Sequence, residues 1–299
     1  MVIDYEKIIV NFIVMILEGL PFLLIGAIAS AIIQLFISED RIKKIIPKNN
    51  FLAMLIASLL GIFMPICECA IIPVTRSLIQ KRVPIKIAVI FMLSVPIVNP
   101  IVTLSTYYAF SDVRMVLIRL IGGMISAITI GILIDKTSKG NVLKKSNLYG
   151  DYCDCGCSIN NFFTNKSKIR LCIEHSISEF FKIFRYYIFG AFISSIFMGI
   201  INENMLKSLG SNKLLSVLIM MIIAFILSLC SEADAFIAKG FLEYFNIPSI
   251  SAFLILGPMM DLKNAIIVGS YFKKEFTVKL ICVIFMVVGI FSLLLNLVF

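Results

Sequence analysis

Residues 65–74 read PICECAIIPV and place a carboxylate, Glu68, between the thiols of Cys67 and Cys69 at the end of an apolar run. The whole chain is 60% hydrophobic with a mean hydropathy of +1.02, whereas a soluble domain is roughly 45–50% apolar. Runs of bilayer-spanning length fall at about 8–37, 51–74, 85–110, 113–134, 172–201, 213–229, 249–271 and 276–298. The composition predicts an all-α, multi-pass membrane protein in contact with the lipid bilayer.

The ends and loops of these runs carry the orientation signal. The first run, 8–37, is longer than the ~7–15-residue core of a signal peptide, and no small-residue cleavage site follows it, so we expect it to remain as a membrane helix. The net charge is +9, from 27 Lys and Arg against 18 Asp and Glu, and the basic residues gather in short loops between apolar runs. That distribution is typical of membrane proteins, so nucleic acid is not an expected partner.

The two halves of the sequence resemble each other. One offset of 164 residues, without a gap, aligns Gly26 with Gly190, Ser30 with Ser194, Glu68 with Glu232 and Pro84 with Pro248. The alternative is chance similarity between segments rich in Ile and Leu. We therefore predict a first membrane repeat over 1–134, a polar loop over 135–171 that contains cysteines and faces the cytoplasm, and a second membrane repeat over 172–299.

Two topologies fit the eight runs. If 51–84 and 213–248 are re-entrant hairpins, each half crosses the membrane three times, the repeats are inverted, and the loop Lys and Arg residues divide eighteen to five. If every run spans, the repeats are parallel and the division is thirteen to ten. Since Lys and Arg in short loops mark the cytoplasmic face, we favour the inverted repeats, with eight spanning helices as the alternative. The inverted topology places Lys48, Arg82 and Lys274 in the cytoplasm, and Lys213 and Phe299 outside.

Polar residues interrupt each half twice. The predicted hairpin tips lie at 65–69 and 228–234, and the following helices are broken at 94–100 and 258–264, where prolines remove backbone donors. Paired interruptions in two repeats are the best sequence indication of a transport site. The candidate residues for binding a substrate or ion are Cys67, Glu68, Cys69, Asn99, Ser231, Glu232, Asp234, Asp261, Lys263 and Asn264.

The acids among these residues need compensation. An ionised carboxylate at mid-bilayer costs about 2.5–3.5 kcal/mol even on lenient scales, and Lys263 is the expected counter-ion for a glutamate or for Asp261. The hairpin arms also carry Arg76 and Lys81, which must then face water or protein. The alternative for Glu68 and Glu232 is that they cap helix ends in water near an interface.

The cysteines suggest the cargo. Two thiols beside a buried acid favour a soft or borderline cation or a thiol-reactive metalloid, although cysteine is also a small packing residue. In the loop, Cys153, Cys155 and Cys157 alternate with other residues and could wrap a metal ion if the cytoplasm keeps them reduced. The alternative there is a linker with incidental cysteines. The sequence requires no cofactor, and a bound metal ion is a candidate.

The segments PICECAIIPV, SVPIVNP, LCSEADAF and GPMMDLKN, together with the cysteine-bearing loop, resemble the predicted permease family that contains YraQ-like permeases and ArsP organoarsenical efflux permeases. The similarity covers nearly the whole chain. It implies a multi-pass permease of the cell (inner) membrane that exports metal or metalloid species and can work beside a second small membrane protein.

We therefore expect a secondary transporter, not an enzyme, with its site between the two hairpin tips. No phosphate loop of the GxxxxGK[ST] type occurs in the chain, so an ion gradient would drive it. Three alternatives remain: a transporter of an organic or lipid-linked anion with a partner subunit, a membrane thiol oxidoreductase using Cys67 and Cys69, and a non-transporting sensor subunit. Substrate, coupling ion, direction and oligomeric state do not follow from the residues.

Overall fold

A computed structural model describes residues 5–36, 47, 49–63, 67–138, 140–144, 168–200 and 213–297. The described part of the chain is helical, with one isolated β-bridge between Leu143 and Phe272. Its helices are α1 (Tyr5–Phe36), α3 (Asn50–Leu59), η1 (Leu60–Ile62), α4 (Glu68–Gln80), α5 (Ile85–Val98), α6 (Pro100–Phe110), α7 (Val113–Thr137), α8 (Lys168–Ile200), α10 (Lys213–Leu227), α11 (Asp234–Gly240), η3 (Phe241–Glu243), α12 (Ile247–Met259), α13 (Leu262–Tyr271) and α14 (Lys274–Leu295).

Within these residues, five helical segments are long and apolar enough to cross a membrane. They are Ile8–Ile33, Val113–Thr137, Cys172–Phe197, Ile247–Tyr271 and Lys274–Leu295. The pair α5 and α6, bent by 42°, would make a sixth. Helix α3 has 10 residues and α10 has 15, so at 1.5 Å per residue both are shorter than a bilayer core of ~30 Å. The prediction of an all-α, multi-pass membrane protein is confirmed.

The two halves present the same order of elements. Each begins with a long helix and a short apolar helix, continues with a short helix that follows a break, then a pair of helices separated by a break, and ends with a long helix. The corresponding pairs are α1 and α8, α3 and α10, α4 and α11, α5 and α12, α6 and α13, and α7 and α14.

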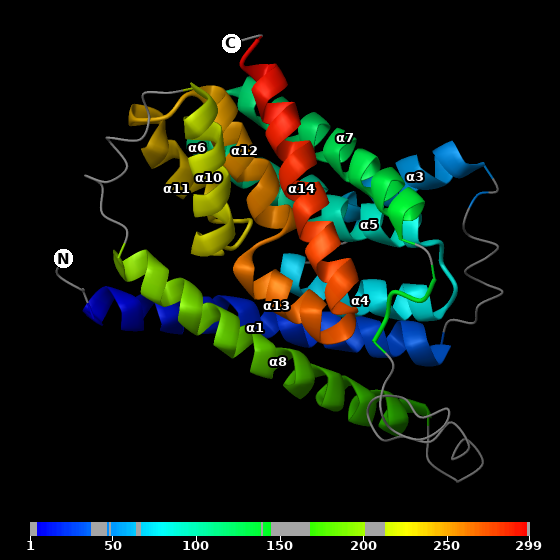
Figure 1. Cartoon of the computed structure of the whole chain (residues 1–299). Helices are drawn as coiled ribbons and strands as arrows, with labels where there is room; N and C mark the ends of the chain where they lie inside the picture. The colour runs from blue at the N-terminus through cyan, green and yellow to red at the C-terminus, as the bar shows by residue number, and fades with distance from the viewer. Residues whose placement is uncertain are drawn as a thin grey trace.

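Corresponding long helices pack against each other in opposite directions. Phe12 of α1 stacks edge-on against Phe192 of α8 at 5.8 Å between ring centroids. Later in α1 but earlier in α8, Tyr187 Oη donates to the Met15 carbonyl at 2.6 Å, so the two helices run antiparallel. Figure 1 shows α1 and α8 side by side along one edge of the bundle. Helices α7 and α14 also run antiparallel. Lys279 Nζ, near the start of α14, donates to the Thr137 carbonyl at the end of α7 at 2.8 Å, and Gly122 of α7 lies against Phe291 near the end of α14.

The broken helices continue past their prolines. Pro96 lies inside α5, which ends at Val98, and Pro258 lies inside α12, which ends at Met259. The breaks come where a side chain caps the next helix: Asn99 accepts from the Ile101 amide at 3.0 Å, and Asp261 accepts from the Asn264 amide at 2.6 Å. An Asn or Asp cap satisfies an amide that the new helix leaves free. At the first break the cap Asn99 directly precedes Pro100, the first residue of α6, so cap and proline mark this boundary together, whereas Pro96 and Pro258 lie inside their helices.

The described parts of three segments that the inverted topology predicts to be cytoplasmic lie together, at Lys86, at Asp135 and Leu143, and at Phe272. There Lys86 Nζ lies 4.0 Å from the Asp135 carboxylate, and the backbone at Leu143 pairs with Phe272. The loop before α12 lies with the end of α14, because Asn246 Nδ2 donates to Asn296 Oδ1 at 3.1 Å. The helices extend slightly into the predicted loop 135–171, since α7 ends at Thr137 and α8 begins at Lys168.

Several predictions fall outside the described residues. They concern the three loop cysteines Cys153, Cys155 and Cys157, the tip residue Pro65, and the two topology markers Lys48 and Phe299. The domain boundaries at 134–135 and 171–172 stay predictions.

Candidate functional site

The described end of the first predicted tip, residues 67–69, forms a buried helix start. Cys67 precedes α4, Glu68 is its first residue, and the Cys67 carbonyl accepts from the Ile71 amide. Cys67, Glu68 and Cys69 are all buried, with Glu68 only 4% exposed. The free amides of a first helical turn attract a carboxylate, which explains why the sequence can hold Glu68 at this place.

The second tip meets the first. The Cys230 carbonyl accepts from the amides of Ala233 and Asp234, both at 3.0 Å, and so closes a turn before α11. That turn presents Ser231, whose Oγ donates to Glu68 Oε2 at 3.0 Å. Glu68 and Ser231 come from different halves, and neighbouring Glu232 is only partly buried. The two tips are therefore in direct contact, although the two glutamates differ in burial.

A buried ion pair holds the second tip. Arg119 of α7 donates to Asp234 Oδ2 at 2.6 Å, to the Ser231 carbonyl at 3.2 Å and to Thr106 Oγ1 at 2.8 Å. Arg119 is 1% and Asp234 2% exposed. Ser231 also donates to Glu68, so Ser231 links Arg119 to the first tip. The residue list from the sequence omits Arg119, although a charge inside an apolar span is itself a signal.

The break between α12 and α13 supplies a cation to the same region. Lys263 Nζ lies 3.8 Å from Asp261 Oδ2 and 5.6 Å from the Tyr187 ring centroid. Ser228 Oγ accepts from the Leu262 amide at 3.0 Å and so joins this break to the second hairpin. The expected pairing of Lys263 with Asp261 is confirmed. The side-chain amide of Asn264 is buried and has no hydrogen-bond partner among the described residues.

A cavity of about 150 Å³ lies where α1, α8, α13 and both tips meet. Four predicted residues line it: Cys67, Glu68, Cys69 and Lys263. Lining residues absent from the predicted set include Asn11, Glu18, Tyr187 and Cys230. A second, much smaller cavity of about 10 Å³ lies on the other side of Glu68, against Met259, Met260 and Asn264. Glu68 is the residue common to both cavities.

The remaining predicted residues have other positions. Asn99 caps α6, Asp234 pairs with Arg119, and Asp261 caps α13 while it pairs with Lys263. None of the three lines the larger cavity. In the described part of the chain, no group of three or more His, Cys, Asp or Glu side chains is arranged to hold a metal ion. A soft cation at the tips would therefore need a rearrangement of Cys67 and Cys69, or ligands of its own.

Close backbone contacts at two glycines hold the helices around the cavity. A Cβ on Gly26 of α1 would lie 2.5 Å from the Ala70 Cβ, and one on Gly190 of α8 would lie 2.9 Å from the Lys263 Cα. The two glycines align at the 164-residue offset found in the sequence, and each lies where α1 or α8 approaches one wall of the site. Glycine suits such contacts because it has no side chain.

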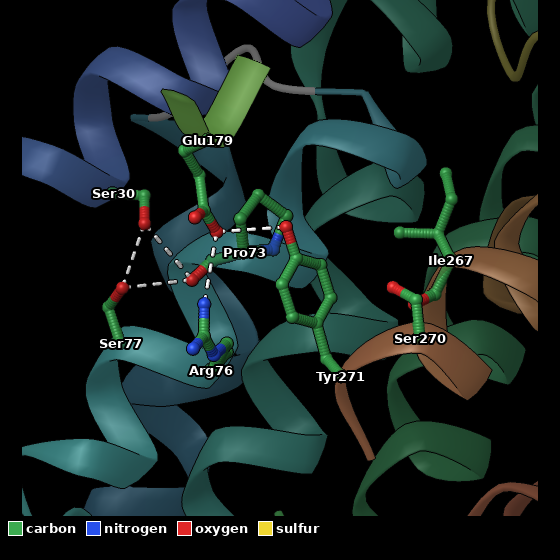
Figure 2. A network of polar contacts seen from close by, with 8 residues as sticks. All are labelled: Ser30, Pro73, Arg76, Ser77, Glu179, Ile267, Ser270 and Tyr271. Carbon is green, nitrogen blue, oxygen red and sulfur yellow. Dashed lines mark hydrogen bonds and ion pairs between the residues drawn. The ribbon is translucent and has the colours of Figure 1, made fainter. Parts of the chain in front are cut away.

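A second buried polar cluster lies beyond the cavity (Figure 2). Glu179 of α8 pairs with Arg76 Nη1 at 3.3 Å and accepts from Tyr271 Oη at 2.8 Å, while the Arg76 guanidinium lies over the Tyr271 ring at 4.8 Å. Nearby, Ser30 and Ser77 are hydrogen-bonded at 2.8 Å between their Oγ atoms. Arg76 is therefore buried in protein, as the hairpin topology requires of this arm.

Comparisons with known proteins agree with this membrane architecture. The family model ArsP_1, described as "Predicted permease", matches residues 5–297. UPF0718 protein YcgR of Bacillus subtilis (strain 168) is 42% identical over 285 residues, which cover 95% of each chain. A Streptococcus mutans protein, whose name describes a subunit of a two-component membrane permease complex, is 36% identical over 286 residues, covering 95% of this chain and 93% of its own. No solved structure matches the chain.

Proposed function

Since the chain belongs to the ArsP_1 predicted permease family, we propose that it is a secondary transporter whose cargo passes through the cavity between the two tips. It is a permease rather than an enzyme. The observation that carries the proposal is the hydrogen bond from Ser231 to Glu68, because it joins the two halves at a buried carboxylate that borders both cavities. A site at the interface of two repeats, beside broken helices, is the arrangement that transporters use.

Inverted repeats belong to this proposal. Helices α1 and α8 occupy equivalent places in the two halves and run in opposite directions, as do α7 and α14. Inverted halves require this, whereas parallel halves would place the paired helices in the same direction. The short lengths of α3 and α10 also favour hairpin arms over crossings. In the inverted topology the protein lies in the cell membrane with Arg82 and Lys274 inside. Labelling of single introduced cysteines on opposite sides at positions 48 and 82 would contradict it.

The cargo class follows from the lining of the cavity. Cys67 and Cys69 offer thiols, and Glu68 offers a carboxylate, so a soft metal ion, a metalloid or another thiol-reactive species suits the site. The site is less suited to bind an organic anion, because Lys263 is already paired with Asp261 and Arg76 with Glu179. If a proton gradient drives transport, Glu68, Glu232 and Asp261 are the candidate proton-carrying groups. The name of the Streptococcus mutans relative supports a second membrane subunit as a partner.

The experiment is flux into reconstituted vesicles with three probes: Cd²⁺, a trivalent arsenical and a radiolabelled aromatic carboxylate. The variant with Cys67→Ser and Cys69→Ser should lose flux of the soft probes while it inserts normally. The matched control is Cys282→Ser, an exposed cysteine on α14. Carboxylate flux that is independent of the tip cysteines, with no flux of the soft probes, would assign the cavity to an organic anion instead.

A further inference from the structure

One face of α1 forms a wall of the cavity from the start of the helix to its middle. Its lining residues are Asn11, Val14, Met15, Glu18, Gly19 and Phe22. Successive members of this set are separated alternately by three positions and one position, which places them on one face of a helix. Because the rise is 1.5 Å per residue, this stripe extends over roughly 16 Å of the helix. The cavity is therefore elongated toward the end of the bundle where α1 begins.

Glu18 is the unexpected member of this stripe. It is the sole Asp, Glu, Lys or Arg residue in the apolar segment Ile8–Ile33. It is exposed, and among the described residues it forms no hydrogen bond or ion pair. A carboxylate at membrane depth needs water or a partner. Water in the cavity can hydrate Glu18, and Asn11, two helical turns before it, continues the polar lining toward the helix start.

The second half of α1 is closed against its neighbours. At Gly26 there is no room even for a Cβ beside Ala70, and Ser30 is hydrogen-bonded to Ser77 of α4. The buried pair of Arg76 and Glu179 lies in the same region (Figure 2). The lining of the cavity does not extend past Phe22 on this helix. Access to the tips is thus blocked from the end where α1 stops.

From these observations we propose that the Asn11–Glu18 stripe of α1 is a cation-selective access path, which connects the tips to the membrane face at which α1 begins. Glu18 supplies the selectivity. Of the charged groups that line the cavity, Lys263 is balanced by Asp261, so Glu18 and Glu68 leave an excess of negative charge. In the inverted topology this face is the outside of the cell. The path deepens the proposed transport function, on which its role rests.

The native cavity cysteines Cys67, Cys69 and Cys230 can report on the path without any cargo. Whole cells are treated with membrane-impermeant methanethiosulfonates, one cationic and one anionic, and modification is read for each peptide by mass spectrometry. The ratio of the cationic to the anionic rate cancels the thiolate fraction of each cysteine. The rates at which the two reagents modify free cysteine in solution normalise the comparison. Since no flux is measured, a failure of the path and a failure of transport are separate results.

We expect the cationic reagent to be favoured at the cavity thiols. The ratio should fall by about threefold or more in Glu18→Gln, because one nearby charge is lost, and invert in Glu18→Lys. The matched control Glu6→Gln, an exposed acid in the first turn of α1, should keep the wild-type ratio. Asn11→Trp should slow both reagents by obstruction. Equal ratios in wild type and Glu18→Gln, modification only after permeabilisation, or cavity thiols that react with neither reagent would each overturn the proposal.

Discussion

Removal of Arg119 should destabilise the protein far more than removal of the whole buried pair to which it belongs. In Arg119→Met, the Asp234 carboxylate stays buried at 2% exposure and loses the guanidinium 2.6 Å away. A buried charge left without its partner costs about 3–5 kcal/mol. The Ser231 carbonyl and the Thr106 hydroxyl also lose a donor. Because these losses overlap at one side chain, we expect a total near 3–5 kcal/mol rather than a sum.

The double variant Arg119→Met with Asp234→Leu tests this reasoning. It removes both charges and keeps apolar volume, which is often neutral or even stabilising. We expect the double variant to lie within about 1.5 kcal/mol of wild type, so the coupling between the two positions should be at least ~2 kcal/mol. The assay is the free energy of unfolding from titration with denaturing detergent in mixed micelles, measured for wild type, both single variants and the double variant. Additive single effects, within ~0.5 kcal/mol, would refute the assignment of Arg119 and Asp234 as a coupled pair.

Two further perturbations test the packing at Gly26 and the metal loop predicted from the sequence. Gly26→Ala should lower stability by about 1–3 kcal/mol, because its Cβ would lie 2.5 Å from that of Ala70. Gly240→Ala, where a Cβ would meet no atom within 4 Å, should be neutral or stabilising in the same thermal denaturation assay. A larger loss at Gly240 than at Gly26 would contradict this packing. Replacement of Cys153, Cys155 and Cys157 by serine should lower metal bound to the purified protein without loss of folding or insertion, since a polar loop contributes little packing. Unchanged metal content by elemental analysis would favour the linker alternative.

The sequence predicts the architecture well because bilayer physics leaves few choices. Apolar length indicates the spanning segments, and the paired positions of the repeat indicate Glu68 and Lys263 as members of one region. Both line the cavity, although Glu68 and Glu232, equivalent in sequence, differ in burial. The difference arises because Glu68 starts a packed α4, whereas Glu232 lies in the turn before α11.

Two kinds of feature depend on tertiary packing and do not follow from the sequence pattern alone: the helix caps and the partners of buried charges. The breaks lie within the predicted ranges 94–100 and 258–264, but the sequence does not reveal that Asn99 and Asp261 cap the helices that follow them. Glu18 and Arg119 were identifiable as charges inside apolar spans. The partner of Arg119 does not follow from the sequence. Asp234 lies 115 residues away in the chain, and the contact depends on how the two halves pack.

The measurement that tests the central claim most directly is flux through reconstituted vesicles by variants of the tip glutamates, at matched protein level, with the probe that wild type moves. The account predicts that Glu68→Gln and Glu232→Gln each abolish flux while folding and insertion persist, because removal of a charge from the membrane interior relieves its desolvation cost. Glu243→Gln, an exposed acid in η3, is the control that should keep wild-type flux. Wild-type flux from both tip variants would place these acids outside the transport path and contradict the account.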